Sequence, residues 1–316
     1  MSSTVVPIST PTKPKHPQAL PAYAAVVVGF MVLVILEGAV VRATGSGAGC
    51  GNHWPLCNGD FFPHHPRLAT IIEYTHRSMT GLCTTLVAIL IGWTFLARPR
   101  LDRARRAVVW SGILLVTEAL LGALLVKGGY VENNTSDMRV VMQCIHFTNT
   151  MLLLAAITVT WWWLRDRPQP TTSFVPQTRT AAWLALGATL IVGGTGSVAA
   201  LADTLFPPTS LQAAFLQDFA AHSPLLVRMR WLHPASALIA LACAIWLALQ
   251  LRNTLGRLVL GFIGVQLILG ALDVVLLAPT WMQILHLLGA DLYWIALVVA
   301  CATVLAPRTL KITSIQ

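Results

Sequence analysis

The chain has 316 residues, of which 56% are hydrophobic and only 10% are charged. A soluble domain normally carries about 25% charged residues, so a chain this apolar cannot cover a surface that faces water. The formal net charge of +9 does not indicate a nucleic-acid-binding protein, because the basic residues are scattered through short segments between apolar runs. The composition therefore predicts a protein embedded in the lipid bilayer.

Eight apolar runs are each long enough to cross a membrane, which takes roughly 20 residues of helix. In chain order they cover residues 22–41, 70–96, 107–126, 140–163, 181–201, 228–250, 256–278 and 281–305. Only a tight turn near Pro279 and Trp281 separates the last two runs. These runs predict an all-α membrane protein with eight transmembrane helices.

The distribution of Lys and Arg predicts the orientation of the chain. If the N-terminus is cytoplasmic, 14 of these residues fall on the inner side and 6 on the outer side, with Arg77 inside a span. The positive-inside rule then favours two cytoplasmic termini. The polar, proline-rich tail has no signal or transit pattern. We expect a multi-pass protein of the bacterial cytoplasmic (inner) membrane.

The chain also looks internally duplicated. The third run contains Thr-Glu-Ala-Leu-Leu-Gly-Ala-Leu at residues 117–124, and the seventh contains Val-Gln-Leu-Ile-Leu-Gly-Ala-Leu at residues 265–272. Chance similarity between apolar helices is the alternative. Because each half has an even number of spans, the halves would be parallel repeats, which predicts two tandem, parallel four-helix bundles. The predicted segments are a cytoplasmic tail, an N-terminal half, a cytoplasmic linker, a C-terminal half and a second cytoplasmic tail, at residues 1–21, 22–163, 164–180, 181–305 and 306–316.

Four of the nine histidines lie inside predicted spans, namely His76, His146, His233 and His286. Each follows the start of an even-numbered span by five or six residues, which places it roughly 8–9 Å below the outer boundary. Hydrogen bonds between helices are the simpler alternative for a single histidine. Four rings at one depth, two in each half, favour metal ligation. Haem suits such pairs, whereas zinc needs four close ligands. We therefore predict one haem at His76 and His146 and another at His233 and His286.

The two halves differ beside these histidines. Glu73 lies three residues before His76 and shares its helix face, while Arg230 holds the matching position before His233. A carboxylate inside a membrane is a candidate functional group, and a salt bridge to Arg77 or Arg67 is its structural alternative. This asymmetry predicts one reactive site and one electron-transfer site. Four further acidic residues in or near spans have no predicted role beyond polar pairing: Glu37, Glu118, Asp273 and Asp291.

Two of the six cysteines, Cys50 and Cys57, lie in the first outer loop. A disulfide is plausible there because the outer side is oxidising, and both a redox role and a structural one stay open. The other cysteines lie within spans and are interpreted as small core residues. A Cys-x-x-Cys-His motif is absent from the sequence, so covalently attached haem is not expected.

The first half resembles the haem A synthase family. The resemblance rests on Gly-Cys-Gly at 49–51, Trp-Pro-Leu-Cys at 54–57 and Glu-Tyr-Thr-His-Arg at 73–77. It extends over the whole chain and is strongest at residues 38–81. It implies that haem O is oxidised at its C8 methyl group to a formyl group, giving haem A for terminal oxidases.

The resemblance also implies roles for individual residues. His76 and His146 would bind the substrate haem, with Glu73 as the essential acid, and His233 and His286 would ligate a haem b cofactor. Cys50 and Cys57 match the outer-loop pair that handles reducing equivalents, and Arg77 and Arg42 are candidate contacts for haem propionates. Haem O and the haem O synthase that supplies it are the implied partners, together with an electron donor that the sequence does not identify.

The sequence departs from the family pattern at two places. Many members carry a second cysteine pair in the outer loop of the second half, but residues 201–227 contain none. His233 is followed by Pro234, where arginine is common, and a proline perturbs a helix locally.

Two other classes of protein compete with this interpretation. The first alternative is a two-haem b-type membrane cytochrome that only transfers electrons, for example from quinol. The second is a transporter built on the repeat, which would show Gly or Pro breaks at matching mid-membrane positions. The spans show no such matching breaks.

Overall fold

The computed structural model describes residues 18–165 and 174–306, and all regular structure within these ranges is helical. Residues 1–17 and 307–316 of the predicted tails, and 166–173 of the predicted linker, lie outside the described residues. The helices are α1 (Ala19–Ala43), α2 (Leu68–Ala97), α3 (Arg103–Lys127), α4 (Asp137–Leu164), α5 (Pro176–Leu205), α6 (Leu211–Phe219), α7 (Leu225–Arg228), α8 (Leu232–Leu251), α9 (Thr254–Val275) and α10 (Thr280–Leu305). Eight candidate spans result when α7 and α8 are taken together, which confirms the predicted number.

Several helices begin earlier than the apolar runs suggest, because polar capping residues set their starts. Asp102 accepts a hydrogen bond from the backbone N–H of Ala104 at the start of α3, and Ser136 caps α4 in the same way. Asn253 caps α9. A capping side chain satisfies backbone donors that the first helical turn leaves unpaired. The helices therefore extend beyond the stretch that the apolar pattern marks.

The sixth span is interrupted at its outer end, between α7 and α8. The break precedes Pro234, which is the third residue of α8. Proline has no N–H and is tolerated in the first turn of a helix, where that donor would be unpaired in any case. The N–H of His233 donates to the carbonyl of Arg230 at 3.2 Å across the break. The disturbance predicted at Pro234 thus takes the form of a new helix start, and His233 lies in its first turn.

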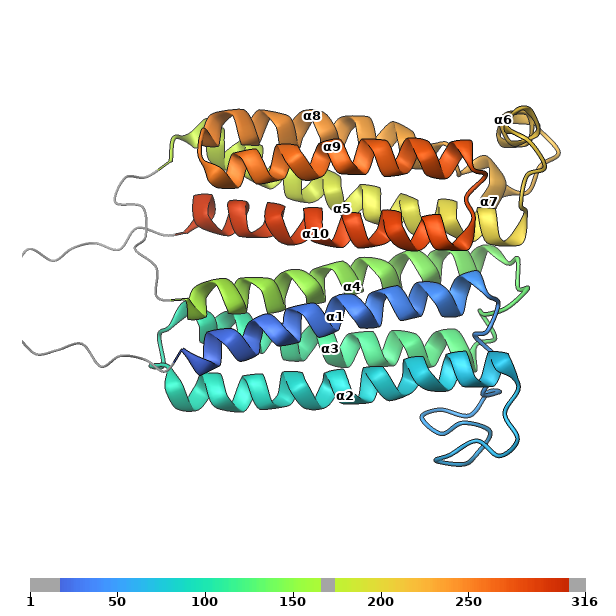
Figure 1. Cartoon of the computed structure of the whole chain (residues 1–316), viewed down its shortest axis with the longest axis horizontal. Coiled ribbons are helices and arrows are strands. Elements are labelled where there is room, and N and C mark those ends of the chain that lie inside the picture. Colours follow the sequence, from blue (N-terminus) through green and yellow to red (C-terminus); the bar gives the residue numbers. More distant parts are fainter. Residues whose placement is uncertain (1–17, 166–173, 307–316) are drawn as a thin grey trace, which may run out of the picture.

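The spanning helices form two groups that run side by side, as Figure 1 shows. In the first group, α2 and α4 each pack against α1 and α3. In the second, α8 and α10 each pack against α5 and α9. The helices that carry the four histidines therefore lie diagonally opposite each other within their own group.

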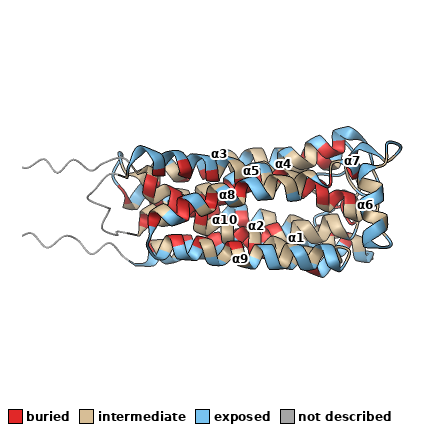
Figure 2. Cartoon of the chain, turned by 90° about the horizontal axis from the view of Figure 1, so that it is seen from above, coloured by how far each residue is buried: buried red, intermediate tan, exposed pale blue. Residues whose placement is uncertain are grey.

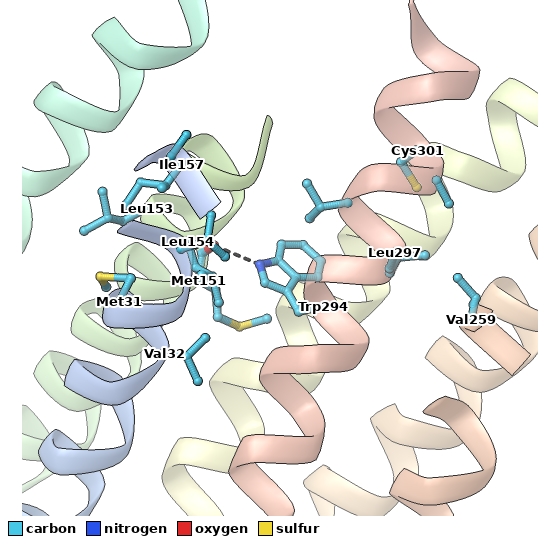
Figure 3. Close-up of a cluster of buried hydrophobic side chains, with 14 of the residues drawn as sticks. Met31, Val32, Met151, Leu153, Leu154, Ile157, Val259, Trp294, Leu297 and Cys301 are labelled. Carbon is cyan, nitrogen blue, oxygen red and sulfur yellow. Dashed lines mark hydrogen bonds between the residues drawn. The ribbon is translucent and has the colours of Figure 1, made fainter. Parts of the chain in front are cut away.

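The two groups meet through α1 and α4 on one side and α5 and α10 on the other. These are equivalent helices of the two halves, which is how an axis relating parallel repeats would pair them. Side chains from α1, α4 and α10 interlock at this interface, and the indole N–H of Trp294 donates to the carbonyl of Met151 at 2.9 Å (Figure 3). Buried apolar packing and this bond hold the halves together.

The outer surface of the bundle is apolar. Figure 2 shows exposed positions along α3 and α9 and buried ones toward the interior. Large apolar side chains such as Trp110 and Val116 on α3, and Ile268 and Val274 on α9, are among the exposed ones. Water would strongly disfavour such a surface, whereas lipid solvates it. The chain is therefore a multi-pass membrane protein.

Candidate functional site: two histidine pairs

The structure brings together both predicted histidine pairs. The rings of His233 on α8 and His286 on α10 lie 6.2 Å apart between centroids and meet edge to face. His76 on α2 and His146 on α4 lie on the two helices that each pack against α1 and α3. All four side chains are half-buried. Each pair spans the diagonal of its own helix group, which is where a bundle core holds a cofactor.

Each histidine ring lies against a glycine of the preceding spanning helix. A Cβ atom placed on that glycine would approach the ring carbon Cε1 at 3.1 Å for Gly38 and His76, 3.8 Å for Gly122 and His146, 2.9 Å for Gly196 and His233, and 3.2 Å for Gly270 and His286. Gly122 and Gly270 belong to the similar segments 117–124 and 265–272, and Gly38 and Gly196 begin the similar segments Gly-Ala-Val-Val and Gly-Ser-Val-Ala. Because glycine has no side chain, each of these four positions leaves room for a histidine ring of the neighbouring helix.

This arrangement fits haem better than a bare metal ion. Within residues 18–165 and 174–306, no three His, Cys, Asp or Glu side chains gather to hold a metal ion. A haem iron takes most of its ligands from the porphyrin and needs only axial ligands from the protein. The Nδ1 atoms of His76 and His146 are buried without a hydrogen-bond partner. The pair His233 and His286, with ring centroids 6.2 Å apart, likewise suits a haem iron.

Glu73 is buried, with 3% of its surface exposed, and its carboxylate has three donors. Arg77 donates to Oε1 from Nε at 3.0 Å and from Nη2 at 2.5 Å. The backbone N–H of Cys50 donates to Oε2 at 2.7 Å. The salt bridge to Arg77, considered as the structural alternative, is present. The hydrogen bond from Cys50, which the sequence did not indicate, joins the acid directly to the loop between α1 and α2.

The outer loop between α1 and α2 is closed by the predicted disulfide, and both Cys50 and Cys57 are buried. Arg77 Nη1 donates to the carbonyls of His53 and Leu56, at 2.5 and 2.7 Å. One arginine therefore contacts both the acid and the disulfide loop. The loop contacts the first turns of α2 through Thr70, Glu73 and Arg77.

The second half has a different arrangement at the matching position. Arg230 donates from Nη1 to Asp203 on α5 at 2.7 Å and from Nε to Asp218 on α6 at 2.8 Å. These ion pairs tie the short helix α6 to the outer end of the bundle. The predicted asymmetry is present, since an acid precedes His76 and an arginine precedes His233. The sequence did not indicate α6 or this charged cluster.

Arg42 joins the two halves. Its Nη1 atom donates to the carbonyl of Ala200 at 2.7 Å and to Thr204 Oγ1 at 2.6 Å, both on α5. Its Nη2 atom donates to Gln283 Oε1 on α10 at 2.9 Å. Arg42 and Arg77 thus both have protein acceptors for their guanidinium groups. Their predicted contact with haem propionates stays a prediction.

Glu118 on α3 is a further polar residue at the first histidine pair. One of its carboxylate oxygens lies 3.6 Å from Nδ1 of His146. The sequence placed Glu118 in the repeated motif, opposite Gln266 of the second half, but gave it no role. The signal that could have revealed it was this exchange of an acid for an amide at equivalent positions.

The fold and the two histidine pairs define a multi-pass membrane protein with two pairs of histidines inside its helix groups. Residues 22–298 match the family model COX15-CtaA, described as cytochrome oxidase assembly protein. The chain therefore belongs to this family.

Individual relatives match different lengths of the chain. A protein from Thermus thermophilus named protoheme IX farnesyltransferase is 42% identical over 293 residues, which is 88% of this chain and 47% of that protein. Two proteins named heme A synthase each match 127 residues, or 40%, of this chain. The protein of Alkalihalophilus pseudofirmus is 35% identical, and the match covers 40% of its length. The protein of Geobacillus kaustophilus is 37% identical, and the match covers 38% of its length. The chain spans about half the length, or less, of these curated relatives.

Proposed function

We propose that the chain is a haem A synthase, which oxidises the C8 methyl group of haem O to a formyl group and so gives haem A for terminal oxidases. Family membership supports a place in cytochrome oxidase assembly. The observation that carries the proposal is the asymmetry of the two histidine pairs. A buried carboxylate, Glu73, precedes His76 and is bonded to the disulfide loop, whereas Arg230 holds the matching position before His233.

The first pair is the proposed substrate site, with His76 and His146 binding haem O. Glu73 lies one helical turn from His76, so its carboxylate faces the same region. There it would accept a proton or stabilise positive charge that develops beside the ring. Arg77 keeps the acid in place through its two hydrogen bonds. Glu73 is therefore the proposed catalytic residue.

The second pair is the proposed cofactor site. His233 and His286 would hold haem b, which carries electrons when bound. Their ring centroids are 6.2 Å apart, so both imidazoles would be available to hold the same haem. The matching arginine, Arg230, is occupied by Asp203 and Asp218 and offers no acid to the site. This site is suited to electron transfer, and an arginine stands where the first site has Glu73.

Cys50 and Cys57 are the proposed point where an external electron donor exchanges reducing equivalents with the protein. We propose that the pair lies on the outer side of a bacterial inner membrane, with both termini cytoplasmic and with halves at 22–163 and 181–305. The remaining partner is the haem O synthase that supplies the substrate. A relative named protoheme IX farnesyltransferase, twice as long as the matching region, favours such a functional link.

Expression beside a haem O producer, in a host without haem A, tests the reaction. We expect extracted haems to include a hydroxylated or formyl derivative, identified by mass. If two haems bind and neither is modified, the chain is an electron-transferring cytochrome and the proposal is wrong.

Glu73→Gln tests the proposed acid in the same host. We expect product to fall at least about 100-fold, as for loss of a general acid or base, while both haems still bind. Glu132→Gln is the matched control, because Glu132 is an exposed acid of another outer loop. Normal product from Glu73→Gln would contradict the role given to Glu73.

A further inference from the structure

Glu118 and His146 face each other across the contact between α3 and α4. Oε1 of Glu118 lies 3.6 Å from Nδ1 of His146, just beyond hydrogen-bond length. Within the described residues, His146 is the one site histidine whose ring lies within ion-pair range of a carboxylate. A small rotation of the imidazole would close this contact.

The carboxylate of Glu118 is held in its orientation by neighbours on α4. Asn149 Nδ2 donates to Oε2 at 2.6 Å, and the hydroxyl of Thr150 donates to Oε1. Asn149 in turn accepts a hydrogen bond from Thr117 at 2.8 Å. Both oxygens are therefore fixed, and Oε1 is directed toward the His146 ring.

In the second half, the corresponding contact between α9 and α10 is made by an uncharged side chain. Gln266 takes the position of Glu118 in the repeat. In the amide orientation that satisfies its neighbours, its nitrogen donates to the carbonyl of His286 at 3.2 Å and its oxygen accepts from Ala290 N at 2.9 Å. A neutral amide thus links the two helices through the backbone. The acid in the first half is not required merely to join α3 to α4.

His146 and His233 also differ in the group that Nδ1 faces. In the second half, Nδ1 of His233 lies 3.3 Å from the carbonyl oxygen of Val192, a neutral acceptor. In the first half, the group facing Nδ1 of His146 is an acid. An anionic acceptor makes an imidazole a stronger ligand than a neutral one does, and it fixes which nitrogen carries the proton.

We propose that Glu118 is a positioning residue for His146. It accepts a hydrogen bond from Nδ1–H, so that the Nε2 lone pair points to the haem iron and the imidazole donates more strongly than those of the second half. The haem of the first half then has a lower reduction potential than a neutral partner would give it. This inference rests on the proposed function for one point, the assignment of His146 as a haem ligand.

The test is a redox titration of the full chain, purified in detergent and loaded with protohaem. The component that disappears in His146→Ala is the haem of the first half. In Glu118→Gln we expect this component to shift to higher potential and its ferric EPR spectrum to change. The affinity of the same site for protohaem should fall by about 10- to 100-fold. The second component should be unaffected.

Gln266→Ala is the matched control and should leave the first component unchanged. An unaltered potential and affinity in Glu118→Gln would overturn the proposal. Loss of both components would also overturn it, because Glu118 would then hold the fold and not the ligand. If His146→Ala leaves both components in place, the ligand assignment fails, and with it the substrate site of the proposed function.

Discussion

The backbone N–H of Cys50 donates a hydrogen bond of 2.7 Å to the carboxylate of Glu73, 23 residues further along the chain. A buried acid of α2 is thereby bonded to a cysteine of the outer disulfide. An ionised carboxylate makes charge-assisted hydrogen bonds, which are stronger than neutral ones. The position of the Glu73 carboxylate therefore depends on the conformation of the disulfide loop.

Arg77→Ala should destabilise the first half. Glu73 would be left as a buried carboxylate without its cation, and breaking such a pair costs about 3–5 kcal/mol. The same substitution releases the carbonyls of His53 and Leu56. We expect faster proteolysis of the outer loop, measured on purified protein, with weaker haem binding at the first pair only. Arg77→Lys should lose less stability and less haem binding than Arg77→Ala. Equal haem binding by the wild type and both variants would contradict this account.

Replacement of both Cys50 and Cys57 by Ser should loosen the loop without unfolding the helices. The disulfide closes a short ring, for which chain entropy suggests about 2.5 kcal/mol. We expect a lower temperature of unfolding and a changed absorption spectrum of the haem at His76 and His146. The haem of the second half provides the internal control. A change confined to the second haem would show that the loop does not act on Glu73.

Gly196→Ala should disturb the His233 site. The added Cβ would lie 2.9 Å from Cε1 and 3.1 Å from Nδ1 of that ring, so the imidazole must move. Overpacking of this kind costs about 1–3 kcal/mol. We expect loss of one haem of two, measured as haem per protein. Gly187→Ala on the same helix has open space around it and should retain both haems.

Arg42→Ala should weaken the contact between the two halves. The substitution removes three hydrogen bonds from a cation to α5 and α10 and should lower the free energy of unfolding by about 3 kcal/mol. Thermal unfolding of the haem-free protein in detergent measures this loss. Arg257→Ala, at an exposed arginine, should stay within about 0.5 kcal/mol. If Arg42 serves only a haem propionate, the haem-free variant will be as stable as the wild type.

Much of the candidate site could be predicted because the chain repeats itself. His76, His146, His233 and His286 stand out as polar residues in apolar spans, and the spacing of the spans places them at one depth. The pairing followed from helix order, since helices of one orientation lie on the bundle diagonal. The contacts between helices could not be predicted, because they depend on which face of each helix meets its neighbour.

The sixth span shows that the sequence pattern also leaves part of the fold unpredicted. The apolar run predicted one helix at 228–250, whereas the structure has α7, a break and α8. The short helix α6 was missed because its placement depends on ion pairs between Arg230 and acids distant in the chain. A hydropathy pattern identifies segments that favour lipid, but it does not indicate which charged side chains form ion pairs.

The membrane environment, the eight spans and the presence of four histidines within them could be predicted from the sequence. These properties follow from residue composition and period, which act locally along the chain. The tertiary structure alone decided that Glu73 binds Cys50, that Arg42 joins the halves and that Glu118 faces His146. Those contacts form only once separate helices pack, because hydrogen bonds act over about 3 Å, and no pattern in one segment specifies what will lie that close to it.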